Sequence, residues 1–399
     1  NSFCTLLACS LSMSVSVACP ASEVFSTTAL LEHLARDNAT NGSASPVYVP
    51  TTLPKADAPI PLMEPELAAA ATVPFASIAS DAGAHLRRVL DRLGFAIVAD
   101  VLSAEEVSGI ERLWADDLRS IVDVDASTNA DAVKALLADP VRRWDMKALP
   151  LGSKSAAEWG VVQGRAAWFA RLHPSVHACF ASLFGTDQLC TGTDCIFFNN
   201  APLEAGTNAK KDFFLWPHAD QNSKLEPTGH YECFQGILYV WPADADTSAT
   251  VVWPRSHELV FPRLMEQREF EHHFCMLPDD EHVDFARHAR RVPVPAGAML
   301  LWNSRTIHQG VSSGPRLAFP VCHEPADRRD AQALERKTRC VREGLPTTHA
   351  ASAGIVHPLA ATSDTVYRDD ASGIALRRAA HAGCVNPDGT LRTDIVRML

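Results

Sequence analysis

Two histidines and one aspartate, His218, Asp220 and His308, have the types and spacing that could hold a catalytic metal ion. A non-haem ferrous site takes two imidazoles and one carboxylate on one face of an octahedron and leaves three positions open. On a β-strand, side chains two residues apart point to the same side, so His218 and Asp220 can bind one ion together. The pattern therefore predicts that these three residues form a metal-binding and catalytic site.

A second His-x-Asp pair, His282 and Asp284, has the same spacing in a different context. It lies in a charged stretch, residues 279–290, that is typical of a helix or a solvated surface. On a helix, residues two apart diverge by about 200°, so this pair could not chelate an ion. Too few residues separate this pair from His308 to form the strands expected between the first and the last ligand. We therefore expect His218 and Asp220 to be the ligands.

The secondary structure predicted to position this site changes near residue 194, from helices to β-strands. Before it, apolar residues recur at helical spacing, and Ser103 with Glu106 forms a capping box at the start of one helix. After it, short apolar runs alternate with turn residues, which is typical of an all-β sandwich or barrel. We therefore expect a mainly β fold with flanking helices, in which seven or eight strands form a jelly roll.

Composition divides the chain into three parts. Residues 1–72 are expected to be a low-complexity N-terminal arm, because their second half is rich in Ala, Pro, Thr and Ser without a sustained period. Residues 73–360 should form the catalytic domain, and residues 361–399 a C-terminal extension. Residues 3–21 are apolar like the middle of a targeting peptide but lack its basic flank, so a targeting segment stays an open alternative.

The overall composition excludes several classes of partner. The net charge of −11, without a block of Lys or Arg, argues against nucleic acid and favours a small organic substrate. No apolar run reaches 18 residues, so no transmembrane segment is expected. The 11 cysteines contain no C-x-x-C spacing, which argues against a zinc ribbon or a disulfide framework. A reducing compartment, cytoplasmic or organellar, is the expected location.

The region around the second histidine resembles a known family. Residues 295–310 contain a turn that leads into a buried strand, and His308 lies at the far end of that strand. Three earlier stretches precede it: residues 93–107, His218-Ala-Asp-Gln221 and Thr250–His257. Taken in chain order, the four stretches resemble the phytanoyl-CoA dioxygenase-like family of Fe(II)/2-oxoglutarate-dependent oxygenases. The resemblance covers roughly residues 93–349. It implies a double-stranded β-helix, a cupin-like jelly roll, with Fe(II), the co-substrate 2-oxoglutarate and O2 at its centre.

The same resemblance implies that Arg316 binds the far carboxylate of 2-oxoglutarate. A guanidinium can pair with a carboxylate through two parallel hydrogen bonds, and it stays charged in a half-buried pocket. Turn residues at Ser313-Gly-Pro315 predict that His308 and Arg316 lie on consecutive strands. The sequence departs from the family pattern at Arg255, where relatives usually have glycine before Ser-His, and the interval between His308 and Arg316 is short.

The expected function is that of an Fe(II)- and 2-oxoglutarate-dependent dioxygenase. It would hydroxylate or otherwise oxidise an unidentified small organic substrate and release succinate and CO2. Halogenation is disfavoured, because halogenating relatives lack the ligand carboxylate that Asp220 supplies. Two alternatives stay open: a catalytically inactive jelly-roll binding module, and a hydrolase in which the same three residues hold zinc that activates water.

Overall fold

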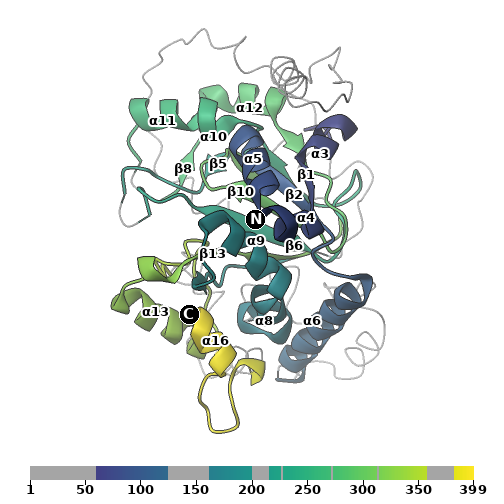
Figure 1. Cartoon of the computed structure of the whole chain (residues 1–399), viewed down its shortest axis with the longest axis vertical. Helices are drawn as coiled ribbons and strands as arrows, with labels where there is room; N and C mark the ends of the chain where they lie inside the picture. Colours follow the sequence, from purple (N-terminus) through teal and green to yellow (C-terminus); the bar gives the residue numbers. More distant parts are fainter. Residues whose placement is uncertain are drawn as a thin grey trace. The chain divides into compact units, whose positions relative to one another are not determined.

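Two β-sheets and a two-stranded ribbon form the centre of the protein in our computed structural model (Figure 1). The structure describes residues 60–124, 161–199, 215–225, 228–270, 273–311, 314–356 and 382–399. All of them belong to one unit, Thr51–Leu399. Within these ranges, no helix has the length and apolarity needed to cross a bilayer.

The larger sheet has six strands and is buried on both faces at its centre. Its order is β1 (Thr72–Pro74), β2 (Phe95–Ala99), β10 (Met299–Asn303), β6 (Phe234–Tyr239), β12 (Arg316–Val321) and β4 (Phe197–Asn199). Strands β1 and β2 are parallel, and the other neighbours are antiparallel. Every residue of β6, β10 and β12 is buried, which explains why these strands are nearly continuous apolar runs in the sequence.

The smaller sheet has five antiparallel strands and carries the two predicted histidine ligands. Its order is β8 (Cys275–Met276), β5 (His218–Ala219), β11 (His308–Val311), β7 (Ala249–Val252) and β9 (Arg290–Arg291). Strands β13 (His323–Pro325) and β3 (Leu189–Thr191) pair separately. The two main sheets face each other: Arg316 of β12 in the larger sheet donates a hydrogen bond to Thr250 of β7 in the smaller sheet. The predicted jelly roll is confirmed.

Helices cover the other face of the six-stranded sheet. Helices α3 (Pro65–Ala71), α5 (Ala84–Leu93) and α8 (Arg165–Leu172) pack against its strands. Trp114 of α6 (Ala104–Val124) meets Phe319 of β12 edge-on, with ring centroids 5.8 Å apart. The predicted capping box begins α6: the Ser103 N–H donates to Glu106 and the Glu106 N–H donates to the Ser103 hydroxyl. The remaining described helices are α4 (Phe75–Asp81), α9 (Pro174–Phe184), α10 (Ser256–Leu259), α11 (Phe261–Gln267), α12 (His282–His288), α13 (Ala331–Glu343) and α16 (Thr393–Met398).

Within the described residues, the packed part of the chain includes residues 60–72, which the composition assigned to the arm. Ile60 and Leu67 are buried, and Thr72 pairs with Ile97 in the sheet. Helix α3 has seven residues and buries only two of them, Leu67 and Ala71, so it shows no sustained apolar period. The sequence pattern could not reveal so short an element. Residues 1–59, with the possible targeting segment, lie outside the described residues.

The end of the expected C-terminal extension packs on the domain. Leu391, Ile395 and Leu399 form one buried cluster with Trp168 of α8 and Val341 of α13. Figure 1 shows α16 beside α13 and α8. The terminal residues therefore contribute to a second small core.

Candidate metal centre

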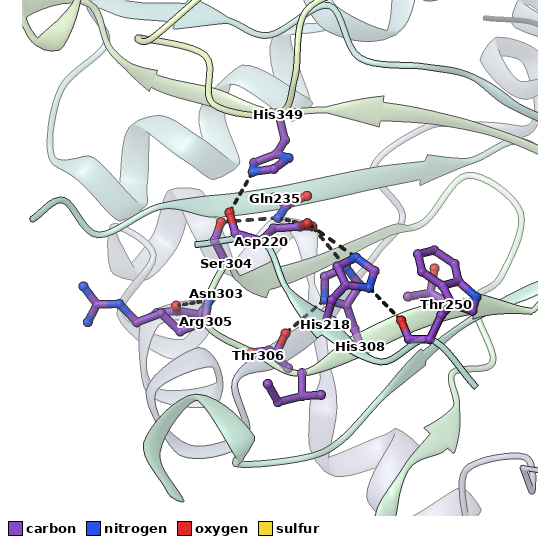
Figure 2. A network of polar contacts seen from close by, with 12 residues as sticks. His218, Asp220, Gln235, Thr250, Asn303, Ser304, Arg305, Thr306, His308 and His349 are labelled. Atoms are coloured by element: carbon purple, nitrogen blue, oxygen red, sulfur yellow. Dashed lines mark hydrogen bonds and ion pairs between the residues drawn. The ribbon is translucent and has the colours of Figure 1, made fainter. Parts of the chain in front are cut away.

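The three residues singled out by the sequence converge at the middle of the smaller sheet (Figure 2). His218 on β5 pairs directly with His308 on β11, and residues opposite each other in a sheet point to the same face. Their ring centroids are 4.5 Å apart. Asp220 follows β5, and its two oxygens lie 3.4 Å from His218 Nε2 and 3.2 Å from His308 Nε2.

Both imidazoles are held in the tautomer that a metal requires. Nδ1 of His218 lies 3.0 Å from the carbonyl oxygen of Trp216, and Nδ1 of His308 lies 3.0 Å from that of Thr306. In each case the Nδ1–H donates to the carbonyl two residues earlier, which leaves Nε2, the atom that faces Asp220, as the ligand atom for a metal. Adjacent ligands about 2.1 Å from an octahedral ion are about 3.0 Å apart, close to the spacing seen here. The donor set therefore fits a divalent transition metal.

Asp220 is ionised and fixed in place by its neighbours. Burial works to raise the pKa of its carboxyl, but the imidazoles of His349, His218 and His308 hold that pKa well below its usual range. The Gln235 amide donates to Asp220 Oδ2 at 2.8 Å. The carboxylate therefore has one orientation, toward the two histidines.

The pKa values of the two histidines are shifted in opposite directions. Burial alone would lower the pKa of His218, but the adjacent Asp220 carboxylate raises it above its usual value. Burial and the neighbouring His218 lower the pKa of His308. His308 therefore stays neutral more readily than its partner.

Two tryptophans form walls beside the histidines. The Trp216 indole stacks on the His218 ring, with centroids 4.7 Å apart and planes 17° apart, and it is half-buried. Trp302 lies against His308, with centroids 5.1 Å apart, and is buried. Part of an aromatic side chain next to a histidine of the site therefore stays exposed.

Arg316 is a buried guanidinium between two aromatic rings. Its Cζ lies 4.3 Å from the Phe197 ring centroid and 5.3 Å from that of Tyr239. Its Nη2 donates to the Tyr239 hydroxyl at 2.9 Å and to the Thr250 hydroxyl at 3.1 Å. Its Nε has no hydrogen-bond partner, and no Asp or Glu pairs with it in the described part of the chain. A buried cation without an acidic partner is suited to bind an anion.

The alternative pair, His282 and Asp284, lies apart from this centre. Both belong to α12, as their charged context predicts, and Asp284 is paired with Arg287 at 3.6 Å. His282 Nε2 lies 3.1 Å from the Leu277 carbonyl oxygen. The helix keeps the two side chains from binding one ion.

The departure at Arg255 has a structural explanation. Arg255 has φ 64° and ψ 4°, in the left-handed region where glycine is favoured. Its N–H donates to the Leu93 carbonyl, and its guanidinium pairs with Glu258 at 3.0 Å. The loop therefore keeps a conformation suited to glycine although it carries arginine.

Several residues of the centre were not identified from the sequence. Tyr239, Thr250, His349 and Gln235 are absent from the predicted site. They come from β6, β7 and the segment after α13, which only the fold brings together. Gln235 and Thr250 are polar residues within otherwise apolar runs, and this is the sequence feature that could have marked them as part of the site.

Two imidazoles and one carboxylate on a jelly roll are typical of non-haem iron oxygenases. Residues 90–316, more than half of the chain, match the phytanoyl-CoA dioxygenase (PhyH) family. The chain therefore belongs to the phytanoyl-CoA dioxygenase family, whose members are iron enzymes that depend on 2-oxoglutarate and O2.

One curated relative is Ava biosynthesis cluster protein O of Aspergillus versicolor. It is 26% identical over 223 residues, which are 52% of this chain and 70% of the relative. Among solved structures, the epimerase SnoN in complex with Fe3+, alpha ketoglutarate and nogalamycin RO is 16% identical. That match has a TM-score of 0.37 and covers 63% of this chain and 84% of SnoN. A hypothetical protein of Escherichia coli, JW0805, is 12% identical with a TM-score of 0.47, over 88% and 92% of the two chains.

Proposed function

We propose that this protein oxidises a small organic molecule, with His218, Asp220 and His308 as Fe(II) ligands and Arg316 as the anchor for 2-oxoglutarate. The reaction would consume substrate, 2-oxoglutarate and O2 and give hydroxylated or otherwise oxidised product, succinate and CO2. The observation that carries the proposal is the convergence of the three side chains, whose ligand atoms lie within 4.8 Å of one another.

The position of Arg316 fits a five-carbon diacid bound at that metal. Val252 pairs directly with His308, and Thr250 lies two residues further along the same strand, on the same face. Two residues of a strand span about 7 Å. Because the Arg316 guanidinium lies 3.1 Å from the Thr250 hydroxyl, it can hold one carboxylate while the other end of the diacid reaches the metal.

Iron with 2-oxoglutarate and O2 would supply the oxidising power in this site. The chain's own residues orient the reactants. The carbonyls of Trp216 and Thr306 fix the two imidazoles, and Gln235 fixes the carboxylate. Burial of the two histidines keeps water away from them, which strengthens the electrostatic interactions at the centre.

The substrate is proposed to be a small organic molecule that contacts Trp216. This indole is half-buried and lies on the ring of a metal ligand, so a molecule stacked beside it would be close to the metal. The name of the Aspergillus versicolor relative, which places it in a biosynthesis cluster, is consistent with a small-molecule substrate.

Turnover of 2-oxoglutarate tests the proposal. Purified protein with Fe(II), 2-oxoglutarate and O2 should form succinate, and omission of any one of the three should stop it. A small-molecule library then identifies the substrate as the compound that accelerates succinate formation and is itself oxidised.

The same assay separates the alternative functions. Hydrolysis supported by Zn(II) without 2-oxoglutarate would indicate a zinc hydrolase. Metal binding without succinate formation, with every library compound, would indicate a binding module.

A further inference from the structure

A segment beyond the matched family region closes onto the metal centre. We call residues 345–356 the strap; they follow α13 and the family match ends at residue 316. The strap folds back on itself, because the Thr348 N–H donates to the Ile355 carbonyl at 2.8 Å and Thr347 pairs with Val356. It is therefore a compact loop and not an extended tail.

The strap is hydrogen-bonded to the rest of the domain on both sides of His349. At its start, the Gln163 amide donates to the Leu345 carbonyl, and the Thr193 N–H donates to the Thr347 hydroxyl, each at 2.8 Å. Further along, the Ser352 N–H donates to the buried Glu324 carboxylate at 2.6 Å. These contacts hold the residues between them, including His349, in a defined place.

The strap also lies too close to β3 for a side chain to intervene. Gly192 follows β3, and a Cβ added there would lie 2.8 Å from the Thr348 carbonyl oxygen. Glycine at this position therefore allows the strap to approach.

From the strap, His349 reaches the metal centre. Its Nε2 lies 2.9 Å from the main-chain carbonyl oxygen of Asp220. The Asp220 N–H donates to the Ser304 carbonyl at 3.0 Å, so the aspartate's main chain is held on both sides. Figure 2 shows His349 pointing at Asp220 from the side away from His218 and His308.

We propose that His349 is a positioning residue of the metal site: its hydrogen bond fixes the main chain of Asp220 so that the carboxylate faces both histidines before metal binds. This inference rests on the metal site proposed above. Asp220 lies just beyond the two-residue strand β5, so few ladder hydrogen bonds hold it. Partners that orient metal ligands typically contribute about 10- to 100-fold to metal affinity.

The test is Co(II) binding to the full chain, measured by calorimetry and by the visible absorption of bound Co(II). His349→Ala and His349→Asn should each weaken Co(II) binding about tenfold, because neither side chain reaches the Asp220 carbonyl. His349→Gln should restore wild-type affinity, since its amide nitrogen can take the place of Nε2. Thr348→Ala is the matched control, because this neighbouring hydroxyl has no hydrogen-bond partner in the described part of the chain.

Each outcome has one meaning. Wild-type affinity in both His349→Ala and His349→Asn would overturn the positioning role. So would weak binding in His349→Gln or Thr348→Ala, because the cause would then be general damage to the strap. Asp220→Ala tests the site itself: if it binds Co(II) as tightly as the wild type, the proposed metal site is wrong and not merely the role of His349.

Discussion

Replacing Arg316 with alanine should weaken 2-oxoglutarate binding and leave metal binding intact. The guanidinium is buried between Phe197 and Tyr239 and is not paired with any described Asp or Glu, so a bound carboxylate would be its partner. Its Nη2 is occupied by the hydroxyls of Tyr239 and Thr250, which orient it. The two histidines proposed as metal ligands lie on the other sheet.

The expected magnitude follows from the burial of this charge. Removing one partner of a buried, hydrogen-bonded charge pair costs about 2–5 kcal/mol, and each 1.4 kcal/mol is tenfold in affinity. The lower limit corresponds to about a thirtyfold rise in the Kd for 2-oxoglutarate. Arg316→Lys keeps the charge without the planar fork, and we expect a smaller rise.

The assay is calorimetric titration of 2-oxoglutarate into Co(II)-loaded protein, together with the KM for 2-oxoglutarate in succinate formation. Arg305→Ala is the matched control, because this half-buried arginine is already bonded to Gln221 and lies over Phe261. Thermal unfolding of each variant checks the fold. Unchanged 2-oxoglutarate affinity in Arg316→Ala would refute the assignment, and a rise in Arg305→Ala instead would transfer the role to that residue.

Three further changes test the packing and the centre. Leu67→Ala should lower the free energy of unfolding, measured by urea denaturation, by about 2–5 kcal/mol. Glu66 is exposed on the same helix, so Glu66→Ala should leave that free energy unchanged. Equal effects of the two substitutions would contradict the packing of α3. Gln235→Leu should weaken Co(II) binding about tenfold by releasing the Asp220 carboxylate, and wild-type affinity would argue against that role. Burial lowers the pKa of His323 to about 3, whereas the unfolded chain titrates near 6.5, so stability is lost as the pH falls below about 6.5. His323→Phe should therefore reduce the stability difference between pH 7.5 and 5.5 by about 1.4 kcal/mol in urea denaturation, and an unchanged difference would contradict it.

The convergence of the three candidate ligands could be predicted from the sequence because the first two lie close together in the chain. His218 and Asp220 lie two residues apart, and His308 follows a recognisable turn and strand. The charged surroundings of His282 and Asp284 were enough to set that pair aside. Local spacing and context therefore predicted which residues converge.

The supporting residues depend on strand register, which the sequence does not specify. Gln235 reaches Asp220 because β6 pairs with β10, with Trp302 opposite Gln235. Thr250 meets Arg316 only because the two sheets face each other. His349 contacts a residue 129 positions earlier, through a loop that shows no periodicity. Contacts of this kind follow from the assembled fold.

The short N-terminal elements show a second limit. Helix α3 and strand β1 together span residues 65–74 and bury few side chains, so composition alone placed most of them in an arm. Their burial depends on β2, with which Thr72–Pro74 pairs in parallel. Such elements are recognised only once their partner strand is in place.

The central claim is that His218, Asp220 and His308 hold the iron, and anaerobic Fe(II) binding to two aspartate variants tests it most directly. Asp220→Ala should lose more than about 100-fold in Fe(II) affinity, since it removes a ligand and not only a supporting partner. Asp284→Ala, at the same spacing from a histidine but on α12, should bind Fe(II) like the wild type. Full Fe(II) affinity in Asp220→Ala, with loss in Asp284→Ala, would contradict the account.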